Sequence, residues 1–310
     1  MPCVLETIAD LHERFSDLGE GEIWALADEG DAAASYFLWT VFGENGDLNA
    51  PDRDLLVGML KDSAAKGNHL AVSDLGLYLF YGSQGFEEDR EGGLELLREA
   101  ADMGYRNAIF NLGVIHEFEL YDLERAFDYY LAGAELGDPD SMGNLSACYE
   151  DGKGTEPNAE EGRKWLMMAV ENGNAVSQNY YATLLRDGEG GFERDLEGAR
   201  EWFEEASETN ADACFNLGLM HIDENPELAF EYYARGADMG HMECMNNLGI
   251  LYKDGQGVER DLEAAFQWFK VSASLGNAMA AYNLARAYGN GEGTKANHTL
   301  DIDWLRASAE

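Results

Sequence analysis

Asparagine recurs along this chain in a column whose chemistry suits the binding of a peptide backbone. The column comprises Asp74, Asn111, Asn144, Tyr180, Asn216, Asn247 and Asn283. A carboxamide both donates and accepts hydrogen bonds, so a row of them can pair with an extended peptide whatever side chains that peptide carries. The same residues can instead tie one segment of the protein to the next. The sequence leaves both roles open.

Carboxylates follow most members of this polar column six or seven residues later: Glu117, Glu150, Asp187, Asp223 and Asp254. We expect them at or beside the C-terminal ends of helices, where the helix dipole disfavours anions. Their position therefore indicates a role other than stability, and together with the column they form the candidate surface for a partner.

No other pattern in the sequence indicates catalysis. The glycine-x-glycine strings at 152–154, 188–190, 255–257 and 291–293 lack the strand and the ribose-binding acid of a dinucleotide site, so we interpret them as turns. The six histidines are scattered without the spacing of metal ligands. We therefore predict no catalytic residue, no metal site and no cofactor, and we do not expect an enzyme.

The elements that must position these residues repeat along the chain. An anchor residue recurs at intervals of 31 to 37 residues, at Leu38, Leu75, Leu112, Leu145, Tyr181, Leu217, Leu248 and Leu284. The polar column precedes the anchor, and a small residue such as Gly113 or Gly249 follows it. An aromatic residue stands further downstream, at Tyr129, Trp165, Trp202, Tyr232, Trp268 and Trp304. A period near 36 residues is typical of a solenoid.

Each repeat is predicted to be two helices joined by a turn. The spacing places Leu248 and Tyr252 on one face of the first helix and Trp268 on the second helix. The small residue beside the anchor lets the helices approach closely, so a bulky replacement of Gly113 should cost about 1–3 kcal/mol. Glycine at the end of a repeat suits the left-handed residue that closes a helix, and we expect Asn210 to take that place before the sixth repeat.

This pattern resembles the Sel1-like repeat family, a relative of the tetratricopeptide repeats. The resemblance is carried by Leu248, Gly249, Tyr252, Gly255, Gly257, Val258, Asp261, Ala264, Trp268, Ala273 and Gly276. It implies an all-α fold, a right-handed α-solenoid of about eight helix-turn-helix repeats. We expect residues 1–29 to form a capping helix region and residues 30–310 to form a single solenoid of about eight repeats.

The resemblance also implies where a partner binds. In tetratricopeptide packing, the residues one before, two after and five after the anchor line a concave face, which here would hold the polar column with Glu117 and Glu150 further along the helices. Members of the family are mostly adaptors and scaffolds that bind proteins or peptides. The resemblance therefore implies binding rather than catalysis.

Several repeats depart from the pattern, three of them at residues that could have a function. The third (104–136) and the sixth (210–239) lose the glycine turn and carry His116 and His221 where others carry tyrosine. We expect each histidine to cap a neighbouring helix or to face water. In the fifth repeat (173–209), Tyr180 and Tyr181 add aromatic area that either fills the core or anchors a partner.

The net charge is −39, from 60 acidic and 21 basic side chains. Phosphate binding needs clusters of lysine and arginine, so this balance argues strongly against nucleic acid or an anionic membrane as the partner. Three interpretations of the acidity stay open: a solvated surface, a docking surface for a basic protein or peptide, and adaptation to a salty cytoplasm.

The N-terminal residues 1–19 mix charged with apolar side chains and show no signal-peptide pattern, and no apolar run is long enough to cross a membrane. The cysteines Cys3, Cys148, Cys214 and Cys244 do not pair within a repeat, which favours reduced thiols in the core. Cys214 and Cys244 occupy similar places in adjacent repeats and are expected to lie near each other. We expect a cytoplasmic protein.

Together these patterns predict a non-enzymatic protein that binds a basic protein or peptide through an acidic concave surface. A narrower form of this hypothesis is an immunity or inhibitor protein that neutralises a toxin or effector. The alternative is a general scaffold or adaptor in a signalling or regulatory assembly, with the charge serving solubility only. The sequence determines neither the identity of the partner nor the oligomeric state.

Overall fold

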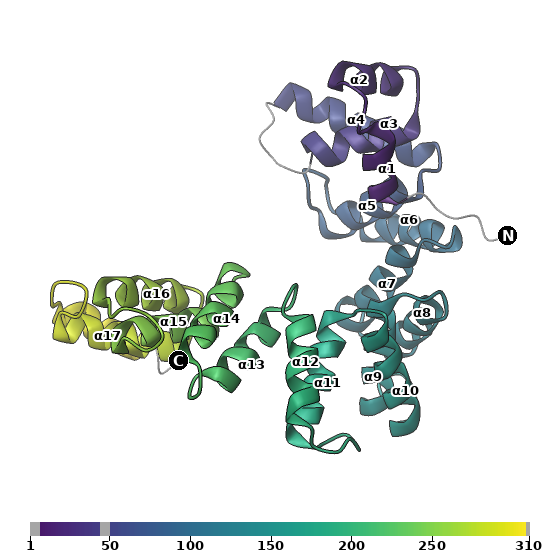
Figure 1. Cartoon of the computed structure of the whole chain (residues 1–310). Helices are drawn as coiled ribbons and strands as arrows, with labels where there is room; N and C mark the ends of the chain where they lie inside the picture. The colour runs from purple at the N-terminus through teal and green to yellow at the C-terminus, as the bar shows by residue number, and fades with distance from the viewer. Residues whose placement is uncertain (1–6, 44–49, 308–310) are drawn as a thin grey trace. The chain divides into compact units, whose positions relative to one another are not determined.

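The computed structural model describes residues 7–43 and 50–307, and every regular element in these ranges is helical (Figure 1). The α-helices there are α1 (Ile8–Phe15), α2 (Glu20–Asp28), α3 (Ala32–Leu38), α4 (Ala50–Ala65), α5 (His69–Tyr81), α6 (Arg90–Asp102), α7 (Arg106–Val114), α8 (Leu123–Glu135), α9 (Pro139–Asp151), α10 (Ala159–Glu171), α11 (Ala175–Asp187), α12 (Leu196–Ala206), α13 (Ala211–His221), α14 (Pro226–Asp238), α15 (Met242–Asp254), α16 (Leu262–Ser274), α17 (Ala278–Asn290) and α18 (His298–Ala307). Short π-helical segments, η1 (Trp39–Gly43) and η2 (Ile115–Glu119), continue α3 and α7. The prediction of an all-α fold is confirmed.

The chain divides into two compact units, Met1–Trp165 and Leu166–Glu310, with the boundary inside α10. In the first unit each helix from α2 to α9 packs on the next one along the chain, and in the second unit α11 to α18 do the same. Each unit is therefore a stack of helical hairpins whose core forms between sequence neighbours, as expected of a solenoid. A single solenoid over residues 30–310 stays a prediction.

The N-terminal helices contribute to the core of the first unit. Leu11 and Phe15 of α1 and Ile23 of α2 are buried. The Phe15 ring lies 5.1 Å from the ring of Phe37 on α3, measured between centroids. These contacts cover the start of the helical stack, in the place where a capping region is predicted.

A glycine lies in close contact with an aromatic ring inside several hairpins. A Cβ atom placed on Gly113 would lie 2.6 Å from the Tyr130 ring. The same construction gives 2.3 Å between Gly218 and Tyr233, and 2.5 Å between Gly249 and Phe269. These distances are shorter than van der Waals contact, so the small residue after the anchor is what allows the two helices to approach.

The rings in these contacts belong to a different column from the predicted aromatic one. Tyr129, Trp202, Tyr232 and Trp268 are only half-buried. The residue after each of them occupies the core instead, at Tyr130, Phe203, Tyr233 and Phe269. One residue turns the side chain by about 100° around a helix, and the second position of each pair is the one that faces the first helix of the hairpin.

The glycine-x-glycine strings are turns between the two helices of a hairpin, as predicted. Their residues have positive φ, for example 70° at Gly255 and 69° at Gly257. A Cβ atom on Gly257 would also lie 2.2 Å from the carbonyl oxygen of Pro226 at the start of α14. The second glycine therefore serves both the backbone conformation and the contact with the preceding hairpin.

The ends of the hairpins follow the glycine prediction except before the sixth repeat. Gly137 and Gly240 have φ values of 82° and 92°. Asn210 does not take the left-handed conformation, since its φ is −116° and its side chain accepts a hydrogen bond from the Ala213 amide as the N-cap of α13. The prediction for Asn210 is therefore wrong. Asn210 caps α13 with its side chain, and an N-cap residue takes an extended backbone conformation instead of a left-handed one.

We predict that Gly113→Ala lowers the free energy of unfolding by about 1–3 kcal/mol, because the added methyl group must displace the buried Tyr130 ring. Chemical denaturation followed by circular dichroism would measure the change. The matched control is Gly58→Ala on α4, where a Cβ atom would meet nothing within 4 Å. That variant should be neutral or up to about 1 kcal/mol more stable, through its higher helix propensity. Equal effects of the two substitutions would contradict the packing argument.

Candidate functional site

The polar column is half-buried, and several of its members form hydrogen bonds between adjacent repeats. The Asn216 amide donates to Asn179 Oδ1 over 3.0 Å, and the Asn283 amide donates to Asn246 Oδ1 over 2.9 Å. In the first unit, the Tyr36 hydroxyl donates to Asp74 Oδ2 over 2.6 Å. In each case the partner stands two residues before the anchor of the preceding repeat.

Two other members of the column bond to a tyrosine from the second helix of the preceding hairpin. The Asn144 amide donates to the Tyr130 hydroxyl, and the Asn247 amide donates to the Tyr233 hydroxyl. Where that core position lacks a hydroxyl, as at Phe203 or Phe269, the column bonds to the preceding first helix instead. In these four repeats, the inter-repeat bond goes to the tyrosine hydroxyl where there is one and to the preceding first helix where there is not.

These bonds give much of the polar column a structural role. The side chain of Asn111 is half-buried, and Tyr180 is the most exposed member, with 36% of its surface accessible. Tyr181, by contrast, is half-buried and packs on the edge of the core beside Phe192, with ring centroids 4.9 Å apart. Peptide binding by the column stays a prediction.

The predicted carboxylates differ in how far they are already paired. Glu117, whose side chain is 12% exposed, accepts a hydrogen bond from the Tyr130 hydroxyl over 2.8 Å and lies 3.6 Å from Lys153 Nζ. Asp187 accepts two hydrogen bonds from Arg186, from Nε to Oδ1 over 2.8 Å and from Nη2 to Oδ2 over 2.7 Å. These hydrogen bonds lower the pKa of the Asp187 carboxyl group. Asp254 lies 3.7 Å from Lys253 Nζ. Part of the predicted rim is therefore neutralised within the chain.

The structure brings some predicted site residues together in each unit. In the first unit the Tyr130 hydroxyl joins Glu117 and Asn144. In the second, Arg186 joins Asp187 to Asn216, since its Nη1 donates to Asn216 Oδ1 over 3.1 Å. Glu150 and Asp223 lie exposed near the ends of their helices.

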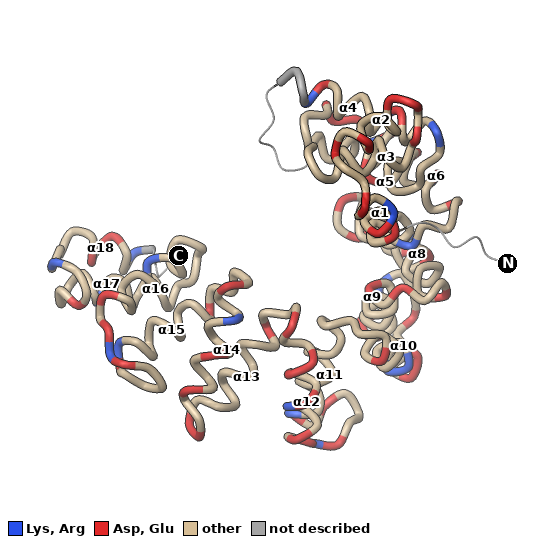
Figure 2. Tube along the Cα trace, turned by 45° about the horizontal axis from the view of Figure 1, so that its top comes forward, with Lys and Arg blue, Asp and Glu red and all other residues tan. Residues whose placement is uncertain are grey.

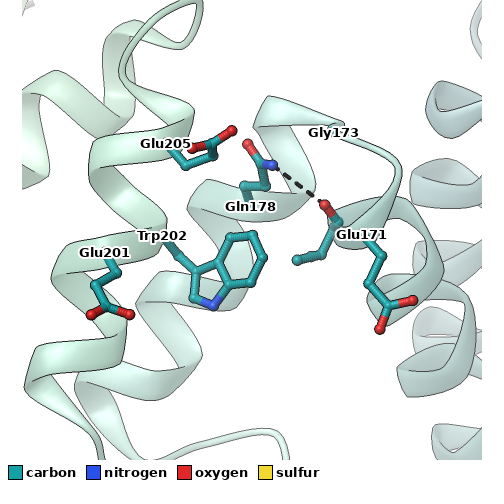
Figure 3. A pocket seen from close by; sticks show the side chains of 7 residues that line it. Glu171, Gly173, Gln178, Glu201, Trp202 and Glu205 are labelled. Atoms are coloured by element: carbon teal, nitrogen blue, oxygen red, sulfur yellow. Dashed lines mark hydrogen bonds between the residues drawn. The ribbon is translucent and has the colours of Figure 1, made fainter.

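A pocket in the second unit was not predicted. It measures about 410 Å³ and lies between the end of α10, the start of α11 and one face of α12. Its lining includes Val170, Glu171, Gln178, Glu201, Trp202 and Glu205. Figure 3 shows the Trp202 indole in the middle of these side chains, with the Glu205 carboxylate beside Gln178 and the Glu171 and Glu201 carboxylates directed outward. The sequence analysis placed Trp202 in the recurring aromatic column of the second helices, and only the fold brings the α10–α11 turn opposite it.

An exposed apolar turn between η2 and α8 is a second unpredicted feature. Phe118, Leu120 and Tyr121 are 61%, 39% and 83% exposed. Tyr121 also has a φ of 54°, a conformation that is costly for a bulky residue. Acidic residues flank these side chains at Glu119 and Asp122. Large exposed aromatics of this kind are typical anchors at protein interfaces.

The two histidines of the short repeats lie against aromatic rings rather than in water. His116 is 1% exposed, and its ring lies 5.3 Å from that of Tyr129. His221 stacks on Tyr232 with a centroid separation of 5.8 Å. Burial lowers the pKa of His116, and neither of its ring nitrogens is hydrogen-bonded. The expectation that it caps a helix or faces water is wrong, because the shortened turn draws the ring into the core.

The cysteines within the described residues are free and buried thiols. Burial raises the pKa of Cys148 to about 11, so this thiol is protonated at neutral pH. Cys214 and Cys244 lie near each other, since both would contact a Cβ atom on Gly236. Cys3 lies outside the described residues. Over residues 7–43 and 50–307, no group of three or more His, Cys, Asp and Glu side chains could hold a metal ion.

Among the described residues, no helix combines the length and the apolar character that crossing a membrane requires.

We predict that Tyr233→Phe lowers the free energy of unfolding by about 0.5–1.5 kcal/mol, because Asn247 loses its hydroxyl partner. Tyr232→Phe is the matched control, since it removes a hydroxyl from the adjacent residue of the same helix. Urea titration of both variants would measure the difference. A loss of the same size in both would show that the inter-repeat bond contributes nothing specific.

The chain is similar in sequence to curated proteins and in fold to solved structures. DAP3-binding cell death enhancer 1 of Rattus norvegicus is 27% identical over 171 residues, which cover 54% of this chain and 30% of that protein. The chain thus spans under a third of that curated relative. Among solved structures, a Sel1 repeat protein from Oxalobacter formigenes superposes with a TM-score of 0.62 at 22% identity, covering 98% of this chain and 91% of the other.

A protective antigen of uropathogenic Escherichia coli strains, described as displaying an SLR fold, superposes with a TM-score of 0.50 at 21% identity, covering 94% of this chain and 79% of the other. At these identities the likeness concerns the fold alone.

The Sel1 repeat itself matches the chain in seven segments: residues 69–105, 106–138, 139–174, 175–208, 211–241, 243–277 and 278–310. The expected first repeat, 30–66, lies outside them, although α3 packs on α4 there. Sel1 repeats mediate protein–protein interactions and are usually non-catalytic. With hairpins matched over most of its length, this chain belongs to the Sel1 repeat family.

Proposed function

We propose that this protein binds a basic protein or peptide through its acidic surface and catalyses no reaction. The observation that carries the proposal is the excess of 60 acidic over 21 basic side chains, a net charge of −39. Figure 2 marks acidic positions along helices and turns in both units, with few basic ones among them. A field of this sign attracts cationic partners and speeds their association.

The basic side chains add little positive surface, because many of them already face acids of this chain. Arg90 Nη2 lies 3.0 Å from Glu119 Oε2, Arg235 Nη1 lies 3.1 Å from Glu208 Oε1, and Lys164 Nζ lies 2.9 Å from Glu161 Oε2. Exposed pairs of this kind contribute little stability. Their consequence here is that the uncompensated charge is almost entirely negative.

Two surfaces fit the role of contact regions. In the first unit, the apolar turn at Phe118 and Tyr121 offers aromatic anchors among carboxylates, which suits a partner that is both basic and apolar. In the second unit, the predicted residues Asp187 and Asn216 lie beside each other through Arg186. The polar column and the remaining carboxylates extend the proposed concave face along each unit.

The narrower form of the proposal is that the partner is a cationic toxin or effector, which this protein neutralises as an immunity protein does. A strongly acidic binder can cover the basic surface of such an enzyme. The alternative function is a general scaffold or adaptor in which the charge serves solubility. The two differ in how binding responds to ionic strength, because only electrostatic capture depends strongly on screening.

We predict that the protein, immobilised and exposed to an extract of its source cells, retains a basic protein at low salt and loses it at about 0.5 M salt, where the Debye length falls below about 5 Å. Mass spectrometry would identify the retained protein and so test the immunity hypothesis. A partner retained equally at both salt concentrations would overturn electrostatic capture and favour the scaffold.

Charge reversal would locate the binding surface. We predict that Asp187→Lys combined with Asp223→Lys weakens partner binding by about tenfold or more, without unfolding the protein. The control combines Glu193→Lys with Glu231→Lys, which are exposed positions in the same unit and outside the predicted face. Isothermal titration measures affinity, and circular dichroism checks the fold. If both double variants lose the same affinity, only total charge matters and the predicted face is wrong.

A further inference from the structure

We propose that the pocket of the second unit receives an arginine side chain of the partner protein. This inference rests on the proposed function, since it assumes a basic partner, and it names the place and the residue type that such a partner would use. It is carried by the pocket itself, by its aromatic wall and by the sign of the charge around it.

The wall of the pocket is the indole of Trp202. The ring is half-buried, and the edge-on contact with Tyr181, at a centroid separation of 5.9 Å and an interplanar angle of 65°, holds it in place. Within the described residues, cations of this chain lie over other rings, for example Lys164 over Trp165 and Arg235 over Tyr232, but none lies over Trp202. The indole is the strongest cation-binding aromatic surface among the side chains.

Carboxylates lie at the rim of the pocket. Glu201 and Glu205 stand one helical turn apart on α12, on either side of Trp202 in the sequence, and the Glu205 carboxylate lies on the same side of the indole as Gln178 (Figure 3). Glu171 lines the pocket at the end of α10, with its carboxylate directed away from the ring. The described lining contains no lysine or arginine. The pocket therefore combines a polarisable face with acceptors and carries no internal cation to neutralise them.

The buried floor adds a further acceptor. Gln178 is 4% exposed, and its amide nitrogen donates to the Val170 carbonyl oxygen over 3.3 Å, which fixes the side chain. Figure 3 shows the Gln178 side-chain oxygen and the Glu205 carboxylate on the same side of the indole. A ligand that donates several hydrogen bonds while stacking on the ring would match this arrangement.

Arginine has that combination of properties. Its guanidinium group is planar, carries five N–H donors in a fixed fork, stacks on aromatic faces and is more weakly hydrated than an ammonium group. A volume of about 410 Å³ accommodates the group with its methylene stem. Lysine would leave the indole face poorly covered, and a bare metal ion would face an aromatic ring instead of a closed set of oxygen ligands.

The experiment titrates ¹⁵N-labelled protein with Nα-acetyl-arginine amide and, separately, with Nα-acetyl-citrulline amide, its neutral analogue of nearly the same shape. Trp202→Phe assigns the indole N–H signal of Trp202. We expect that signal to shift with the arginine compound and to saturate at millimolar concentration, with at least about tenfold weaker binding of citrulline. Equal binding of the two compounds, or no selective shift of Trp202, would overturn the proposal.

Paired glutamine variants separate the pocket from the overall field. Glu201→Gln with Glu205→Gln should weaken arginine binding by at least about threefold, whereas Glu193→Gln with Glu231→Gln, which removes the same charge elsewhere, should not. Equal effects of the two pairs would refute a specific pocket. Because the substitutions are isosteric and the side chains exposed, both proteins should fold, and circular dichroism verifies this.

The same variants distinguish failure of this inference from failure of the proposed function. Arginine binding at Trp202 without salt-sensitive capture of a basic protein would support the pocket and refute the proposed function. Salt-sensitive capture that is unchanged in the double variant Glu201→Gln with Glu205→Gln would support the proposed function and refute the role of the pocket. Loss of both in that protein supports the two together.

Discussion

The contact between a glycine on the first helix of a hairpin and a buried ring on the second sets the geometry on which the rest of each unit depends. Gly113 against Tyr130, and Gly218 against Tyr233, bring the helix axes close enough for the anchor leucines to be fully enclosed. Because the glycine has no side chain, the ring lies directly on its backbone and holds both helices in register. A hairpin of this size cannot bury its remaining apolar faces alone, so they pack against the neighbouring hairpins.

In the hairpins where this ring is a tyrosine, it also connects the hairpin to the following one. The hydroxyl groups of Tyr130 and Tyr233 reach the asparagine of the next first helix. Where phenylalanine fills that place, as at Phe269, the asparagine pairs instead with Asn246 of the preceding first helix. The half-buried asparagine amide thus finds a protein partner in either of two ways. Each partner replaces the hydrogen bonds to water that the amide loses on folding. Much of the polar column therefore has a structural role, whether or not it also binds a peptide.

Part of the acidity of the chain has a structural use. Asp122, Asp138 and Asp195 are the N-caps of α8, α9 and α12. Each accepts a hydrogen bond from a backbone amide at the end of the helix where the dipole favours an anion. Such caps account for only part of 60 acidic residues. The remainder repel one another in the folded chain and find few cations of their own, which is a cost that a cationic partner would relieve.

The sequence by itself determined the repeat, the all-α fold and the turns, because the period, the anchor leucines and the glycines act through local geometry that neighbouring residues impose. The proximity of Cys214 and Cys244 could also be predicted from the sequence, since equivalent positions of adjacent repeats stack. It could not decide which of two consecutive aromatics, such as Tyr232 and Tyr233, enters the core, because that depends on where the partner helix lies. The burial of His116 and the pocket at Trp202 were likewise decided by tertiary structure, since their surroundings come from segments separated in the chain and meet only when the hairpins pack.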